Sequence, residues 1–348
     1  MLSKKWNERR ERYDFVVIGS GYGGAITAAR LANANVSPKP SVCILERGKE
    51  WPVGSFSNSA EGYAANLRAD GNPLGLYELL NFDQISVLKG SGLGGTSLVN
   101  ANVAIRPDKE IFELGGWPKA LTLAELSDYY ALAEETLNVM AHPRAAALAK
   151  VQALERRAVQ IGGHAQHLPL AVNFTKGPNP QGVHQEACTG CGDCVTGCNV
   201  SAKNTLYMNY LPLAQKGGAE IFTQVKVESI EKTADGWLVH GRWQETNSKS
   251  KKFSLAAGNV ILAAGSINST EILLRSAELR KLSVSPALGT RFGGNGDFFG
   301  LSYNGDHNHN PRFRYAAGVA CRGRPAWSHH CGHGAAQQRR YDSQPLCD

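Results

Sequence analysis

Residues 13–32 read YDFVVIGSGYGGAITAARLA, and this stretch decides the fold. Its apolar run FVVI is bounded by turn-forming residues, which predicts a buried strand. Gly19, Gly21 and Gly24 follow with G-x-G-x-x-G spacing, and an alanine-rich helical pattern extends from residue 25 to residue 31. Strand, glycine turn and helix in this order indicate the first half of a dinucleotide-binding unit.

The second half follows in residues 41–50, SVCILERGKE, which predict another buried strand ending at Glu46. The three glycines let the backbone approach a pyrophosphate, and the helix N-terminus supplies amide donors for it. Glu46 is placed to accept hydrogen bonds from ribose hydroxyls, which favours FAD or NAD over NADP. The alternative is a glycine-rich turn without a ligand, and the complete strand–turn–helix–strand context argues against it.

A second glycine cluster lies in residues 88–108, LKGSGLGGTSLVNANVAIRPD, and is unusual for a simple NAD domain. Backbone at Gly92, Gly94 and Gly95 is free of side chains and suits contact with a ring system or a phosphate. Small polar residues such as Thr96 and Asn100 follow as hydrogen-bond donors. This cluster therefore favours FAD.

With these motifs in view, the sequence resembles the glucose–methanol–choline (GMC) family of FAD oxidoreductases, in the bacterial branch that includes cholesterol oxidases. The resemblance covers about residues 12–308, and its motifs occur in the family's order. Beyond the two glycine segments, these motifs are GWP at 116–118, CTGCGDCVTGCNVSAKNTLYMNY at 188–210, NVILAAGSINSTEILLRS at 259–276 and LGTRFGGNGDFFG at 288–300.

The resemblance implies a role for each matching residue. Gly19, Gly21 and Gly24 would hold the FAD pyrophosphate and Glu46 the ribose. The implied flavin contacts are Gly95, Thr96, Asn100 and Val103, and Thr96 replaces a glycine common in steroid-oxidising relatives. The remaining implied contacts are Val225 at the adenine, Ala264 and Gly265 closing the dinucleotide site, and Asn295 and Asp297 near the flavin or ribityl chain.

The resemblance also implies an activity, namely oxidation of the CH–OH group of an alcohol by hydride transfer to flavin, with oxygen or another acceptor. The substrate class it implies is a sterol or another bulky or long-chain alcohol. The family's catalytic histidine lies in its C-terminal part, beyond the point where this chain diverges, so no catalytic residue is assigned.

Residues 188–198, CTGCGDCVTGC, place four cysteines at C-x2-C-x2-C-x3-C spacing, which is typical of a ferredoxin cluster run. Two hypotheses stay open. Cys188, Cys191, Cys194 and Cys198 bind an iron–sulfur cluster or zinc, or they are structural thiols in a glycine-containing turn region. The first hypothesis allows an alternative function, an iron–sulfur electron-transfer flavoprotein.

The last 38 residues, 311–348, change in character: they contain six arginines but no lysine, glutamate, isoleucine or methionine, and show no helix or strand period. We interpret them as the product of a frameshift near residue 310, with a genuine disordered tail as the alternative. On this interpretation the chain is a C-terminally truncated oxidoreductase, and an inactive FAD-binding remnant is a third functional hypothesis.

These observations define the expected architecture: an α/β, Rossmann-type FAD-binding domain built from residues 10–108 and 199–300. A helical insert over residues 109–198 ends in the cysteine run, and the substrate domain is incomplete.

The net charge of +7 does not indicate a nucleic-acid partner, because the excess lies in residues 1–12 and 311–348 and no basic patch interleaved with aromatic residues stands out between them. We expect no transmembrane segment, since no apolar stretch is long enough for one. Grouped cysteines fit a reducing compartment, so a cytoplasmic location is expected.

Overall fold

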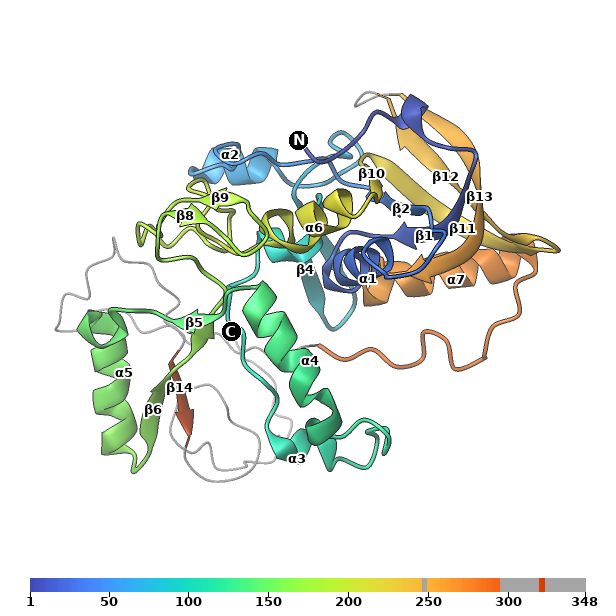
Figure 1. The fold of residues 1–348 in the computed structure, drawn as a ribbon. Helices are drawn as coiled ribbons and strands as arrows, with labels where there is room; N and C mark the ends of the chain where they lie inside the picture. The colour runs from blue at the N-terminus through green and yellow to red at the C-terminus, as the bar shows by residue number, and fades with distance from the viewer. Residues whose placement is uncertain (246–248, 295–318, 323–348) are drawn as a thin grey trace, which may run out of the picture.

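A computed structural model describes residues 1–245, 249–294 and 319–322 of the chain, and its centre is a six-stranded sheet (Figure 1). The strand order is β10-β2-β1-β13-β12-β11. The first four strands are mutually parallel, and β12 and β11 continue the sheet with antiparallel pairing. In this order the strands are β10 (Glu220–Phe222), β2 (Val42–Leu45), β1 (Arg12–Ile18), β13 (Ser250–Leu262), β12 (Gly236–Gln244) and β11 (Val225–Thr233).

Both faces of the parallel strands are buried, which explains their continuous apolar sequences. On one face, Val17 of β1 and Ile44 of β2 pack with α1 (Tyr22–Ala32) and α6 (Tyr210–Lys216). On the other face, the neighbouring residue Val16 joins a core formed with the antiparallel strands. The predicted strand, helix and second strand around the first glycine turn are thus confirmed.

Two antiparallel strands complete the sheet. A turn at residues 234–235 joins β11 to β12, and the apolar run that ends β13 is followed by α7 (Ser266–Arg280). The helix packs against β11, where the Ile230 amide donates to Ser276 Oγ at 2.8 Å. The fold class is therefore α/β with a largely parallel central sheet.

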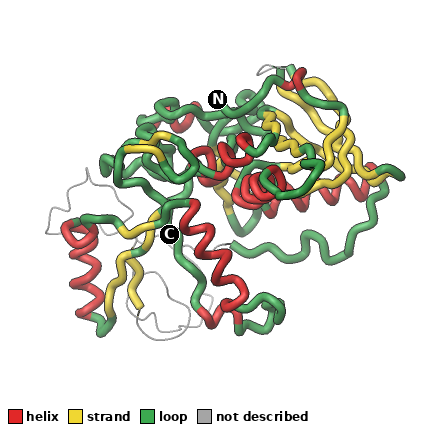
Figure 2. The backbone as a smooth tube through the Cα atoms, in the orientation of Figure 1, coloured by secondary structure: helices red, strands yellow, loops and turns green. Residues whose placement is uncertain are grey.

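The segment between the glycine loops and the later strands contains helices and also short strand pairs (Figure 2). Its expected helical character is correct for α4 and α5, whereas β5 to β9 were not predicted. Its elements are α3 (Lys109–Phe112), α4 (Leu123–Thr136), β5 (Met140–Ala141), η3 (Ala145–Ala147), α5 (Ala149–Gln160), β6 (His164–His167), β7 (Pro169–Leu170), β8 (Gly177–Pro178) and β9 (His184–Gln185).

The remaining elements lie at the ends of the chain and beside the glycine loops. In the tail, residues 319–322 form β14 (Val319–Arg322), which pairs antiparallel with β6 and differs from the expectation of a tail without strands. The others are η1 (Trp6–Glu8), α2 (Ala60–Ala65), β3 (Tyr77–Asn81), β4 (Ser86–Gly90), η2 (Gly95–Leu98) and η4 (Leu206–Met208).

None of the helices in the described part of the chain combines the length and the apolar character needed to cross a membrane.

The first residues of the chain run along the free edge of the sheet at β10. The Lys4 amide donates to the Ile221 carbonyl at 2.8 Å, which extends the backbone pairing by one bond. Trp6 is 8% exposed and packs edge-on against Phe222 and Phe253, with ring centroids 5.6 and 4.7 Å apart. Burial of this large aromatic ring fixes the segment to the core.

We therefore expect Trp6→Ala to lower the free energy of unfolding by about 3 kcal/mol, because it removes a buried indole and leaves a cavity. Urea unfolding followed by circular dichroism measures this loss. The matched control is Tyr129→Ala, at a ring that is 66% exposed, with an expected change below about 0.5 kcal/mol. Equal losses in both variants would contradict the anchoring role of Trp6.

Candidate functional site

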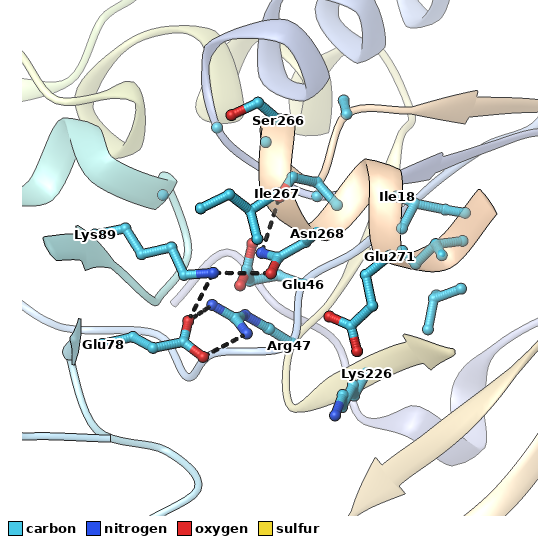
Figure 3. A pocket seen from close by; sticks show the side chains of 18 of the residues that line it. Ile18, Glu46, Arg47, Glu78, Lys89, Lys226, Ser266, Ile267, Asn268 and Glu271 are labelled. Carbon is cyan, nitrogen blue, oxygen red and sulfur yellow. Dashed lines mark hydrogen bonds and ion pairs between the residues drawn. The ribbon is translucent and has the colours of Figure 1, made fainter. Parts of the chain in front are cut away.

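A cavity of about 460 Å³ opens at the carboxyl ends of β1, β2 and β13 (Figure 3). In open α/β sheets, ligands bind at this edge. The volume lies in the range typical of small-molecule and cofactor sites. Of the residues predicted for a cofactor site, the structure brings eight to the lining of this cavity: Gly19, Gly21, Glu46, Gly95, Thr96, Val225, Ala264 and Gly265.

The first glycine turn fits this arrangement through two different glycines. A Cβ at Gly24 would lie 2.0 Å from the Gly19 carbonyl oxygen, so only glycine lets α1 approach β1 this closely. A Cβ at Gly21 would meet no atom within 4 Å. Gly24 therefore has a packing role, whereas Gly21 borders open space at the start of α1.

Two helices begin at the cavity. The N-cap residues are Gly21 for α1 and Gly265 for α7, and neither helix has a side chain that caps its first amides. Uncapped N-terminal amides and the positive end of the helix dipole favour an anion such as a phosphate. The open space at Gly21 is consistent with the close approach of such a group.

The second glycine loop packs directly against the first. A Cβ at Gly95 would lie 2.9 Å from Gly21 Cα. Gly95 begins the short helix η2, and Thr96, which also lines the cavity, is the next residue. The two glycine clusters, 70 residues apart in the sequence, thus form one wall.

Glu46 lies at the end of β2 and is 6% exposed. Its Oε2 accepts from the Ser20 hydroxyl at 2.6 Å and from the Ser20 amide at 3.2 Å, and its Oε1 accepts from the Gly48 amide at 2.8 Å. These bonds fix the carboxylate at the cavity wall.

The sequence did not indicate a group of charged and polar side chains that lies across the cavity (Figure 3). We call this group, which consists of Arg47, Glu78, Lys89 and Asn268, the ionic cluster. Arg47 binds both oxygens of the Glu78 carboxylate, and Lys89 Nζ lies 3.1 Å from the same carboxylate. Lys89 also donates to Asn268 Oδ1 of α7 at 2.8 Å. The cluster joins the end of β2, the β3–β4 hairpin and α7.

Burial and the neighbouring cations act in opposite directions on the pKa of Glu78. Burial alone would raise this pKa, but the hydrogen bonds from Arg47 and the charges of Arg47 and Lys89 outweigh it and hold the pKa below its ordinary value. Nearby Arg68 is also buried, and desolvation followed by the charge of Arg47 lowers its pKa to about 10. Two cations, Arg47 and Lys89, therefore share the Glu78 carboxylate, and Arg68 adds a third positive charge nearby.

Three other predicted residues in the described part of the chain, Gly24, Asn100 and Val103, do not line the cavity. Asn100 donates its side-chain amide to the Tyr22 hydroxyl at 3.0 Å, and Val103 is 38% exposed and pairs with Leu170. Asn295 and Asp297 lie outside the described residues. Gly24 lies behind the turn, as described above.

The cysteine run does not assemble the predicted ligand set. In the described ranges, which include all four cysteines of the run, no group of three or more His, Cys, Asp or Glu residues is arranged to hold a metal ion. Cys191, Cys194 and Cys198 of the run are not in disulfides. Burial raises the pKa of Cys194 to about 11.

A parallel sheet with two helix N-termini and an acidic residue around one cavity defines a dinucleotide-binding α/β protein. The sequence profile of the GMC oxidoreductase family matches residues 13–292. The chain therefore belongs to the GMC oxidoreductase family, as the motifs predicted.

Curated relatives agree with this assignment. The chain is 28% identical over 300 residues to a cholesterol oxidase of Acinetobacter baumannii, covering 80% of this chain and 53% of that protein. It is 29% identical over 305 residues to a cholesterol oxidase of Mycobacterium tuberculosis, covering 81% and 50%. A long-chain-alcohol oxidase of Arabidopsis thaliana is 26% identical over 299 residues, covering 82% and 37%. The chain thus spans about half the length of these two cholesterol oxidases.

The ionic cluster leads to a prediction about pH. Glu78→Gln removes the shared acceptor of Arg47 and Lys89, and we expect it to lower the free energy of unfolding by about 2 kcal/mol at pH 7. Because the folded pKa of Glu78 is depressed, its contribution is present above the unfolded pKa of about 4.3 and is lost as the pH falls through the folded value.

Urea unfolding of wild type and variant from pH 7 to pH 3 tests this, with Glu113→Gln at an exposed glutamate as control. The difference between wild type and Glu78→Gln should shrink towards the acid end of the series. A difference that persists undiminished at the lowest pH would refute the assignment.

Proposed function

We propose that this chain binds FAD in the cavity at the carboxyl ends of β1, β2 and β13. The observation that carries this proposal is the meeting of both glycine clusters, two uncapped helix N-termini and Glu46 at one cavity. A pyrophosphate is the ligand part that needs close backbone approach and amide donors, and ribose is the part that needs a carboxylate acceptor.

In this proposal, Gly21 and the first amides of α1 receive the pyrophosphate, because they border open space. Glu46 receives the ribose hydroxyls, and Val225, which is 1% exposed at the cavity wall, contacts the adenine end. Gly95 and Thr96 face the flavin end, and Ala264 and Gly265 close the site. The flavin contacts of Asn100, Val103, Asn295 and Asp297 stay predictions.

We further propose that the protein is an oxidoreductase acting on the CH–OH group of an alcohol. The flavin, when bound, supplies a hydride acceptor, and the chain supplies the walls that orient it and exclude water. Relatives named cholesterol oxidase and long-chain-alcohol oxidase support a sterol or another bulky or long-chain alcohol as the substrate class, with oxygen or another acceptor.

Binding and turnover are separate parts of the proposal. The chain spans about half of its cholesterol oxidase relatives, and no histidine lies among the described residues that line the cavity. The base that takes the hydroxyl proton is therefore not assigned to any residue here.

The first test is the visible absorption spectrum of the purified 348-residue chain after incubation with FAD and removal of free FAD. We expect the double band of an oxidised flavin, which dithionite bleaches. A colourless protein with native far-ultraviolet circular dichroism would refute the binding proposal.

A glycine substitution gives the second test. Gly21→Ala places a methyl group in the open space that we assign to the pyrophosphate, and Gly21 has φ −67°, which alanine adopts without strain. We expect an unfolding free energy within about 0.5 kcal/mol of wild type and at least about tenfold weaker FAD binding, measured by flavin fluorescence. The contrasting variant is Gly24→Ala, which should destabilise the fold because its methyl group meets the Gly19 carbonyl oxygen. Unchanged FAD affinity in Gly21→Ala would place the pyrophosphate elsewhere.

A further inference from the structure

Lys203 is a buried cation that the proposed function does not use. It is 3% exposed, and it lies just after the cysteine run in the sequence. Its ammonium nitrogen donates to the carbonyl oxygens of Leu98 at 3.1 Å, Asn100 at 2.7 Å and Cys194 at 2.8 Å. A lysine ammonium has three donors, and here each of them meets a backbone carbonyl.

Two of these carbonyls belong to the second glycine loop. Leu98 ends η2, whose residues Gly95 and Thr96 line the cavity, and Asn100 follows two residues later. The Asn100 amide donates back to the Thr96 carbonyl at 2.9 Å, so a shift at residue 100 is transmitted to the cavity wall. Lys203 thus holds the loop through its backbone without itself lining the cavity.

The third carbonyl belongs to a loop that is itself fixed. The Tyr77 hydroxyl donates to the Thr196 carbonyl at 2.7 Å, and the Asn199 side chain exchanges two hydrogen bonds with the backbone of Phe56. A Cβ at Gly197 would lie 2.1 Å from the Phe56 ring, which shows how closely this loop packs. The cysteine run is therefore a rigid support rather than a free segment.

We propose that Lys203 is a positioning residue that uses the cysteine run as an anchor to hold the second glycine loop against FAD. This inference rests on the proposed function for the identity of the ligand. It requires the backbone carbonyl of Cys194 and not its thiol, and in this it differs from the metal hypothesis.

Two variants test the support: one removes the hydrogen-bond donors of Lys203, and the other displaces the cysteine run that accepts one of those bonds. Lys203→Met keeps an unbranched side chain one atom shorter and removes all three donors. Gly197→Ala keeps Lys203 and every thiol. Its methyl group collides with the Phe56 ring, and Gly197 has φ +109°, which alanine adopts only with strain, so the cysteine run must move.

Each variant has a matched control. Cys194→Ser changes the thiol and leaves the carbonyl in place. Gly182→Ala introduces the same strain at φ +82°, in a turn where the new methyl group meets nothing within 4 Å.

The measurements are the FAD dissociation constant from flavin fluorescence, the visible circular dichroism of bound flavin, and hydrogen–deuterium exchange of residues 92–102 in the FAD-free chain. We expect Lys203→Met and Gly197→Ala to bind FAD at least about tenfold more weakly, with an altered flavin circular dichroism and faster exchange in residues 92–102. Exchange in β1 and α1 should stay as in wild type, and both controls should stay within about twofold of the wild-type affinity.

Two results would overturn the proposal: unchanged affinity and exchange in Lys203→Met, or a loss in Cys194→Ser as large as in Lys203→Met. If the amides of β1 in Lys203→Met also exchange rapidly, that variant has unfolded. The FAD affinity of Gly197→Ala and the exchange of its residues 92–102 then decide whether the proposal holds. If the wild-type chain binds no FAD, the proposed function fails, while the exchange of residues 92–102 in the FAD-free variants still tests the role of Lys203.

Discussion

The close contact between Gly24 and the Gly19 carbonyl oxygen determines where α1 sits on the sheet. Because no side chain separates them, the helix lies against β1 and its first turn reaches the carboxyl ends of the parallel strands. Gly95 packs against Gly21 with a similarly short separation, so the second glycine loop takes its position from the first. The cavity wall, the start of η2 and the hydrogen bonds of Lys203 all depend on this one contact.

The sequence was sufficient for the central sheet and for one side of the site. Apolar runs such as residues 15–18, bounded by turn-forming residues, are typical of buried strands, and the glycine spacing indicates the turn after them. Gly21 and Glu46 were therefore predictable, since backbone geometry alone brings them to the strand ends.

The ionic cluster was not predictable in the same way. Glu78 and Lys89 are the single charged residues of the two hairpin strands YELLN and SVLKG, and nothing in these short stretches indicates a site. Only the packing of the hairpin beside Arg47 and α7 turns those side chains towards the cavity. The contacts of the cysteine run were not predictable for a related reason: the spacing describes its thiols, whereas Lys203 and Tyr77 donate to the backbone carbonyls of Cys194 and Thr196.

The position of residues 2–6 along β10 has a consequence for self-association. An edge strand offers unpaired amides and carbonyls to any passing chain, and such edges are common starting points for aggregation. Here the Lys4 amide already occupies the Ile221 carbonyl, and the Trp6 ring covers the apolar side chains beside it. The first residues of the chain thus cover the β10 edge of the sheet. Another molecule cannot add a strand there without first displacing the buried Trp6.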